Sequence, residues 1–146
     1  MTTETKPLKR SDYREFYPIV TRWMDNDIYG HVNNVTYYSY FDSAVNRYLI
    51  EHGGLNIHDA PIVGFVVNSH CNYLAPIAYP DAIDVGLRVN KLGNSSVTYG
   101  VAIFKQGEDQ ACAYGDFIHV FVERAANKAV SIPQSIRTAL TALVVS

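Results

Sequence analysis

The sequence has few cysteines, no long apolar run and no stretch of basic residues. Two cysteines in 146 residues, Cys71 and Cys112, are too few for a disulfide framework, which favours reduced thiols and a cytoplasmic protein. No segment reaches the roughly 20 apolar residues of a membrane span, and the polar stretch 1–10 is unlike a secretory signal. The formal net charge is −2, which argues against nucleic acid as a partner.

Two kinds of catalytic motif are also missing. The chain has no Gly-x-Ser-x-Gly run, the motif that carries the nucleophile of many serine hydrolases. It also lacks any His, Cys and Asp spacing typical of a metal site. We therefore expect neither a metal nor another cofactor. Aromatic residues are abundant instead, with 11 Tyr, 6 Phe and 1 Trp, and Tyr suits half-buried clefts and subunit contacts.

The composition is that of one globular domain, with 48% hydrophobic and 18% charged residues. We expect residues 1–13 to form a flexible tail and residues 14–146 to form the domain. Apolar residues recur at helical spacing between Asn34 and His52, which predicts one long helix. Asn33 or Asn34 can cap its start, and the glycine pair 53–54 supplies its stop.

Strand patterns surround this helix. A strand at residues 16–23 is expected to lie at an edge or carry a bulge because it contains Pro18. Short turns separate the later strands, which indicates antiparallel hairpins. These strands are expected at residues 62–74, 81–92, 96–105 and 111–123. Ser131 and Pro133 open a short final helix. The order predicts an α+β domain in which a curved antiparallel sheet wraps around one long helix.

The strand at 62–74 has two distinct faces by simple alternation. Its apolar face carries Val63, Phe65, Val67, Cys71 and Tyr73. Its polar face carries Asn68, His70 and Asn72. This polar face either points to water or lines a cleft that is shared with a second subunit.

The densest polar cluster, residues 25–34, directly precedes the long helix. Free N–H groups at a helix start favour negative charge, so they could stabilise an oxyanion. A nearby Asp could attack a carbonyl or activate water. The simpler alternative is that Asp and Asn only make the turn and cap of a helix entry.

The run from Arg22 to Tyr37 reads Arg-Trp-x-Asp-x-Asp-x-x-Gly-His-Val-Asn-Asn-x-x-Tyr. It resembles the signature of the 4-hydroxybenzoyl-CoA thioesterase-like group of hotdog-fold acyl-CoA thioesterases. The resemblance extends over about residues 14 to 143. It includes the segments 73–76, 92–96 and 119–122. It implies a hotdog fold and the hydrolysis of acyl-CoA to a carboxylic acid and CoA.

The resemblance also assigns roles to residues of the polar cluster. Asp27 matches the family's catalytic aspartate, a nucleophile or general base. Asn34 matches the position whose backbone N–H polarises the thioester carbonyl. His31 is either a further catalytic residue or a structural one. Asp25 is expected to shape the loop by accepting hydrogen bonds from backbone N–H groups.

Further residues are candidates for binding the substrate. In the family, the pantetheine arm enters at a subunit interface and basic residues at the rim meet the phosphates. Lys91 and Arg88 either serve this purpose or are solvated surface charges, and the hydroxyl groups of Ser95 and Ser96 could donate hydrogen bonds. The polar face with Asn68 and His70 is a second candidate. Tyr37, Tyr40 and Phe41 either line an acyl pocket or belong to the core.

Two other functions stay open on the sequence alone. One is a non-catalytic acyl-CoA binding module, because a fold does not determine a function. The other is a hotdog dehydratase or hydratase, which needs an Asp/His pair placed to move a proton from carbon. A single hotdog copy leaves sheet edges open, so we expect a homodimer or a dimer of dimers (a homotetramer) with active sites at the interface.

Overall fold

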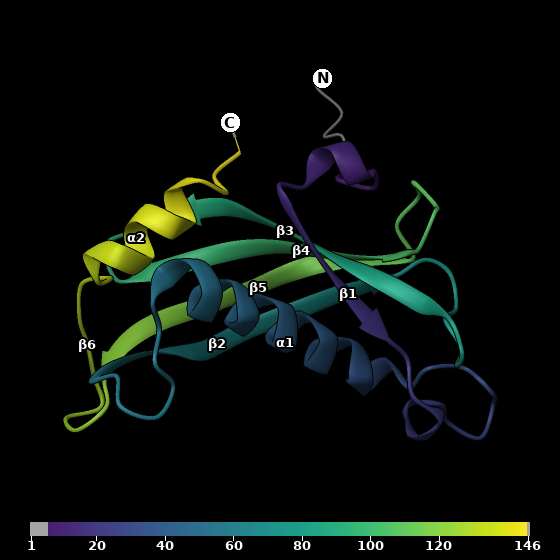
Figure 1. Ribbon diagram of the computed structural model, residues 1–146, viewed down its shortest axis with the longest axis horizontal. Coiled ribbons are helices and arrows are strands. Elements are labelled where there is room, and N and C mark those ends of the chain that lie inside the picture. The colour runs from purple at the N-terminus through teal and green to yellow at the C-terminus, as the bar shows by residue number, and fades with distance from the viewer. Residues whose placement is uncertain (1–5, 146) are drawn as a thin grey trace.

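The computed structural model describes residues 6–145. Its six strands form one antiparallel sheet in the order β1-β3-β4-β5-β2, with the short β6 paired to β5. The sheet curves around the long helix α1, and the shorter α2 packs beside one end of α1 (Figure 1). The bounds are β1 Glu15–Val20, α1 Asn34–Gly53, β2 Ile62–Tyr73, β3 Ala82–Leu92, β4 Ser96–Lys105, β5 Ala113–Glu123, β6 Lys128–Ala129 and α2 Gln134–Thr141. The predicted architecture is confirmed.

The caps that the sequence predicts for α1 are present. The side chain of Asn33 accepts a hydrogen bond from the backbone N–H of Val35 at 3.0 Å, which satisfies one free donor of the first turn. At the other end Gly54 adopts a left-handed φ of 69°, which glycine reaches without steric cost. The cap and the stop each depend on neighbouring residues only. The sequence therefore predicts both ends of the helix to within a residue or two.

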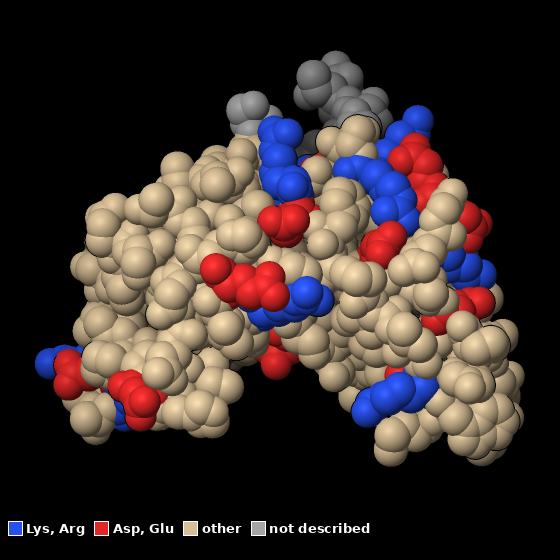
Figure 2. Space-filling model, viewed as in Figure 1, with Lys and Arg blue, Asp and Glu red and all other residues tan. Residues whose placement is uncertain are grey.

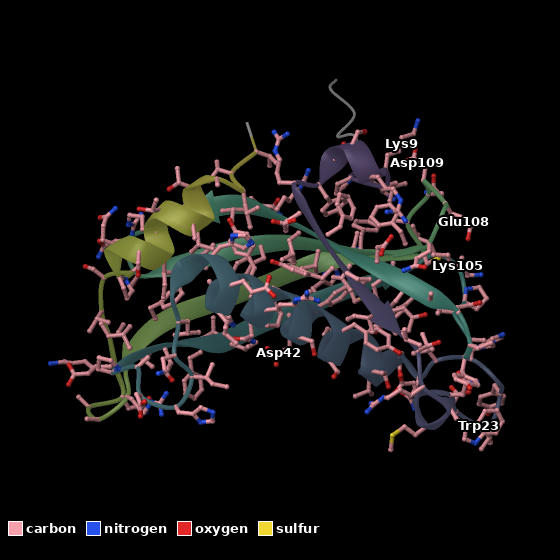
Figure 3. The ribbon with its side chains drawn as sticks, in the orientation of Figure 1. Lys9, Trp23, Asp42, Lys105, Glu108 and Asp109 are labelled. Carbon is pink, nitrogen blue, oxygen red and sulfur yellow. The ribbon has the colours of Figure 1, made fainter. Side chains whose placement is uncertain are left out.

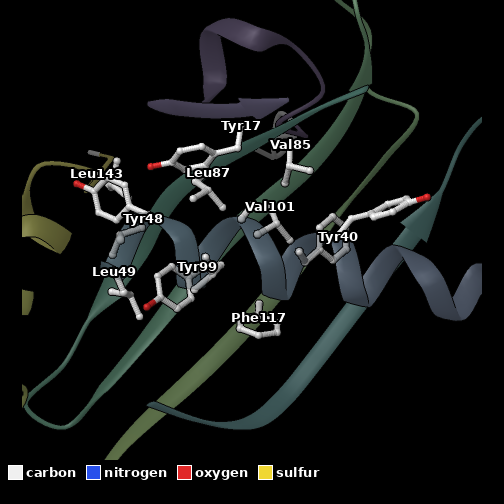
Figure 4. Close-up of a cluster of buried hydrophobic side chains, with 14 of the residues drawn as sticks. Tyr17, Tyr40, Tyr48, Leu49, Val85, Leu87, Tyr99, Val101, Phe117 and Leu143 are labelled. Atoms are coloured by element: carbon white, nitrogen blue, oxygen red, sulfur yellow. The ribbon is translucent and has the colours of Figure 1, made fainter. Parts of the chain in front are cut away.

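The core lies between α1 and the concave side of the sheet (Figure 4). Alternate residues of β3 and β4 point into it, including Leu87, Tyr99 and Val101, and each is at most 1% exposed. From α1 the core receives Tyr40, Phe41, Val45, Tyr48 and Leu49. Burial of each large apolar side chain contributes about 1.5–3 kcal/mol, so this cluster fixes the position of α1 against the sheet.

The prediction of one apolar face along β2 is wrong, because a β-bulge interrupts the strand. The pairing of β2 with β5 shifts register between Val66 and Asn68, and an inserted residue resets the alternation of side chains. Phe65 pairs with Val120 and Asn68 pairs with Ile118. Since these two partners lie on the same face of β5, Phe65 and Asn68 both lie on the convex side. Cys71 therefore lies on the opposite, concave side.

The two edges of the main sheet are β1 and β2. The expected edge position of the strand that contains Pro18 is thus confirmed. The 12-residue β2 has one side that pairs with no other strand of the described residues. Along it Phe65 and Val67 are 54% and 57% exposed. A long exposed edge with apolar side chains is a surface on which another strand can pair.

The expected flexible tail covered residues 1–13, of which 1–5 lie outside the described residues. The carbonyl of Leu8 accepts a hydrogen bond from the N–H of Ala111 at 2.8 Å. The guanidinium of Arg10 lies 3.0 Å from the Asp84 carboxylate. Tyr13 is 5% exposed and packs against Phe104. The packed part of the chain therefore begins before residue 14.

The surface carries acidic and basic side chains in small mixed groups on the face that Figure 2 shows. Within residues 6–145, neither helix combines the length and the hydropathy that crossing a membrane requires. The same stretch contains no group of three or more His, Cys, Asp or Glu side chains placed to bind a metal ion.

Candidate active site

The loop between β1 and α1 is anchored by the buried carboxylate of Asp25, which is 3% exposed. This carboxylate accepts hydrogen bonds from the backbone N–H of Arg22 at 2.9 Å, from the Arg22 guanidinium at 2.9 Å and from the Tyr40 hydroxyl at 2.7 Å. Burial alone would raise the pKa of Asp25, but the donors Arg22 and Tyr40 outweigh it and hold the pKa below its ordinary value. The expected role of Asp25 in shaping the loop is confirmed.

Asp27 lies in a tight turn that ends at His31. Its backbone N–H donates to the His31 carbonyl at 2.9 Å, and its carbonyl accepts from Gly30 at 3.1 Å. One carboxylate oxygen, Oδ1, accepts from the N–H of Tyr29 at 2.9 Å. The φ of Gly30 is 81°, a left-handed conformation that favours glycine. The turn thus orients the Asp27 carboxylate and leaves its second oxygen without a donor among residues 6–145.

A hollow of about 390 Å³ opens beside this turn. It is lined by Asp27, His31, Val32, Asn34, Tyr37, Tyr73, Leu74, Ala75 and Pro76. The structure therefore brings together four of the residues that the sequence singled out: Asp27, His31, Asn34 and Tyr37. They come from the loop and the first turn of α1, which explains why sequence neighbours remain neighbours in space.

The first turn of α1 contributes positive potential to this hollow. Asn33 caps the N–H of Val35 with its side chain and accepts from Thr36 with its carbonyl at 2.9 Å. No acceptor among the described residues bonds the N–H of Asn34. A free N–H at a helix start, together with the helix dipole, favours an anion or a polarised carbonyl oxygen.

A neighbouring part of the lining is aromatic and apolar. The rings of Tyr37 and Tyr73 meet edge to face with centroids 5.0 Å apart, and Leu74 and Pro76 continue the wall. The Tyr73 hydroxyl donates to the Asn34 carbonyl at 3.0 Å, so β2 is tied to the start of α1. Burial raises the pKa of Tyr37 to about 12, which keeps its phenol neutral. The hollow can thus hold an apolar group against one wall and a polar carbonyl against the other.

Six other candidates lie away from this hollow within one chain. Asn68 and His70 lie on the convex side of β2, where His70 lines a separate groove with Arg88 and Asp116. Lys91, Ser95 and Ser96 lie at the β3–β4 hairpin, at the end of the sheet opposite to Asp27 (Figure 1). Arg88 donates from Nε to Asn90 at 2.8 Å and from Nη1 to the Asp12 carbonyl at 3.3 Å, so two of its three nitrogens are engaged within the chain.

Some contributors to the site were not assigned a role from the sequence. The segment after β2 supplies Leu74, Ala75 and Pro76, and the Val32 N–H donates to the Ile77 carbonyl at 2.6 Å. The matching run at residues 73–76 was a usable signal for this segment. Tyr40 gave no such signal, because nothing local connects it to Asp25.

A second hollow lies on another side of Asp27. It is lined by Trp23, Asn26, Asp27, Ile28 and Gly30. Trp23, which Figure 3 labels on the loop before α1, is 77% exposed and meets Tyr79 edge to face at 6.0 Å. Asp27 is the residue that the two hollows share.

His119, a titratable side chain outside the hollow, is a core residue. It is 1% exposed, and its Nδ1 atom lies 3.4 Å from the Tyr99 hydroxyl. Burial lowers the pKa of His119 to about 4, so the ring is neutral at physiological pH. Cys71 and Cys112 are free thiols, and burial raises the pKa of Cys71 to about 11.

Comparison with known proteins adds to this geometry. The family profile described as the thioesterase-like superfamily matches residues 21–140. The PA5185 protein from Pseudomonas aeruginosa strain PAO1 is 59% identical, covers 96% of this chain and 97% of its own, and superposes with a TM-score of 0.94. The PA2801 protein from Pseudomonas aeruginosa, a proposed thioesterase, is 32% identical over 85% of this chain and 95% of its own, with a TM-score of 0.79. The gentisyl-coenzyme A thioesterase BH1999 is 25% identical over 86% of this chain and 99% of its own, with a TM-score of 0.76.

Proposed function

The chain belongs to the thioesterase-like superfamily, and we propose that it hydrolyses acyl-CoA thioesters to a free carboxylic acid and CoA. The family that the motif between Arg22 and Tyr37 predicted is confirmed by the match over residues 21–140. Membership supports thioester hydrolysis as the reaction. The named substrate of the gentisyl-coenzyme A thioesterase supports CoA as the thiol carrier.

The observation that carries the proposal is that one hollow is lined by both the Asp27 carboxylate and Asn34, the first residue of α1. A thioester carbonyl placed between them has its oxygen near the Asn34 N–H and its carbon near Asp27. In the general-base form of the reaction, Asp27 takes a proton from water, and the water oxygen bonds to the carbonyl carbon. In the nucleophilic form, Asp27 itself bonds to that carbon, and water then hydrolyses the resulting anhydride.

Both forms pass through a tetrahedral oxyanion. The Asn34 N–H and the α1 dipole stabilise this negative charge, as in other acyl-transfer enzymes. The carbon–sulfur bond then breaks and CoA leaves as a thiolate, which takes up a proton from solvent. Since a thiolate is a good leaving group, the reaction does not require a strong acid at position 34. We assign His31 to the polar wall that receives the carbonyl end of the substrate.

The acyl group is proposed to lie against the wall of Tyr37, Tyr73 and Leu74. This wall lies directly beside the polar one, so the bond to be cleaved falls at the boundary between them. A relative at 25% identity is named for an aromatic acyl-CoA. An aryl-CoA therefore belongs in the substrate panel beside acetyl-CoA and longer alkyl-CoAs.

The open edge of β2 supports a homodimer or a dimer of dimers. If two copies pair their β2 strands antiparallel about a two-fold axis, the Ile62 end of one copy lies beside the Tyr73 end of the other. The β3–β4 hairpin lies at the Ile62 end, because Ser96 pairs with Val120 and Val120 with Phe65. The hairpin of one copy would thus approach the hollow of the other.

In this arrangement the remaining candidate residues could contact the CoA part of the substrate. Lys91, Ser95 and Ser96 at the hairpin of the second copy are proposed to meet the CoA phosphates and pantetheine. Asn68 and His70 lie on β2, next to the pairing edge. The substrate-binding residues would then come from both copies, which explains why a single chain does not bring them together.

The test measures thiol release from acyl-CoAs, from acetyl to palmitoyl plus one aryl-CoA. The wild type is compared with Asp27→Asn, which keeps the shape of the side chain and an acceptor for the Tyr29 N–H. The matched control is Asp42→Asn, an exposed carboxylate on α1 outside the hollow (Figure 3).

We expect turnover by the wild type and by Asp42→Asn, and at least a hundredfold loss in Asp27→Asn. Absence of thiol release by the wild type with every CoA ester would contradict the hydrolase. Binding of acyl-CoA without turnover would establish the non-catalytic binding module instead.

A further inference from the structure

We propose that Tyr40 is a positioning residue, which acts through the buried carboxylate of Asp25 to fix the Asp27 loop against α1. The inference rests on the proposed function of Asp27 and extends it to a residue outside the hollow. Tyr40 does not line the hollow of Asp27. Its ring lies 6.4 Å from the ring of Tyr37, which does line it, so a test of the link through Asp25 must remove the hydroxyl and keep the ring.

The link joins two buried side chains. Tyr40 is 5% exposed and Asp25 is 3% exposed. The Tyr40 hydroxyl donates to Oδ2 of Asp25 at 2.7 Å, a length typical of a strong bond to a charged acceptor. The guanidinium of Arg22 binds the other oxygen, Oδ1, at 2.9 Å. The backbone N–H of Arg22 also donates to Oδ2, at 2.9 Å. Among these donors to the carboxylate, Tyr40 is the one that belongs to the helix.

Asp25 forms hydrogen bonds with the α1 region through two separate groups. Its backbone carbonyl accepts from the N–H of Asn33, the N-cap residue, at 2.8 Å. Its carboxylate binds Tyr40, which follows Asn34 by six residues and lies about 9 Å further along the helix axis. Because these two bonds join Asp25 to different turns of the helix, they restrict rotation of the loop about the helix start. One attachment alone would leave that rotation free.

Asp27 lies two residues beyond this anchor. The hydrogen bonds of its own turn join it to Tyr29, Gly30 and His31, all within the loop. They keep the turn in shape but do not fix it relative to the helix body. The position of the Asp27 carboxylate with respect to the Asn34 N–H therefore depends on the Asp25 anchor, together with the bond from Val32 to Ile77.

The experiment compares Tyr40→Phe with Tyr48→Phe. Tyr48 lies further along the same helix, is 4% exposed and donates its hydroxyl to the Ala139 carbonyl at 2.5 Å. Each variant removes one buried phenol hydroxyl and keeps the ring. Only the first hydroxyl is connected to the loop of Asp27.

We expect Tyr40→Phe to lower kcat by about tenfold to a hundredfold, because a displacement of about 1 Å has such an effect on rate. KM should stay within about twofold, since Tyr37, Tyr73 and Leu74 keep their places. Tyr48→Phe should retain the wild-type kcat. A role of Tyr40 in stability alone would instead lower the melting temperature of Tyr40→Phe and leave its kcat unchanged.

A second measurement does not depend on activity. Amide hydrogen exchange of Asn33 and Asp27 reports the bonds to the Asp25 and His31 carbonyls. Both amides should exchange faster in Tyr40→Phe and at the wild-type rate in Tyr48→Phe. If Tyr40→Phe does not fold, Asp25→Asn replaces it, because that side chain keeps its shape but loses the charge that Tyr40 binds.

The outcomes separate this inference from the proposed function. An active wild type with equal kcat and equal amide exchange in both tyrosine variants would overturn the role of Tyr40 and leave the hydrolase intact. A wild type that releases no thiol would refute the hydrolase, and the amide exchange would then still support or overturn the anchoring of the loop.

Discussion

Acidification should destabilise the fold through His119. Burial lowers the pKa of this residue in the folded protein from 6.5 to about 4. As the pH falls, the unfolded chain therefore binds a proton before the folded one does. The stabilisation is fully present above pH 6.5 and is lost as the pH falls toward 4. At 1.36 kcal/mol per pH unit, the loss is about 3 kcal/mol between these limits.

The assay is urea unfolding between pH 4 and pH 7.5 at fixed protein concentration, because association would add a concentration-dependent contribution. Carboxylates titrate over part of the same range, so the informative quantity is the difference between variants. His119→Gln does not titrate and should lose about 3 kcal/mol less than the wild type on acidification. His58→Gln, at an exposed histidine, should follow the wild type. Parallel pH curves for His119→Gln and the wild type would refute the reasoning.

Two further predictions concern the turn of the site and the sheet edge. Gly30→Ala and Gly107→Ala both place a Cβ at a left-handed φ, 81° and 84°. Each should lower the free energy of unfolding by about 1–2 kcal/mol, but only Gly30→Ala should also lower thiol release, and equal activities would contradict a role of the 27–31 turn. Val67→Lys puts a charge on the exposed edge strand, so sedimentation velocity should show a monomer where the wild type is a dimer. A wild type that sediments as a monomer at micromolar concentration would contradict the homodimer.

Much of the fold could be predicted because its signals are local. The cap at Asn33, the stop at Gly54 and the alternation in β3 and β4 each depend on neighbouring residues, and the structure agrees with them. The bulge of β2 could not be predicted in this way. The bulge depends on how β2 pairs with β5. Val67, the inserted residue, is an ordinary strand residue, so the sequence around it does not predict a bulge.

The residues of the candidate site also differ in whether a local sequence signal identifies them. Asp27, His31, Asn34 and Tyr37 lie within eleven residues of one another in the sequence, so the motif identified them together. Tyr40 could not be linked to Asp25, because the two residues are fifteen positions apart and meet only once the loop has folded against α1.

The two ends of helix α1 have different roles. Its first turns face the hollow, through Asn34 and Tyr37, while its last turns hold the domain together through Tyr48 and its bond to α2. Substitutions that reshape the hollow beside Tyr37 need not weaken the packing around Tyr48, because eleven positions, about three helical turns, separate the two residues.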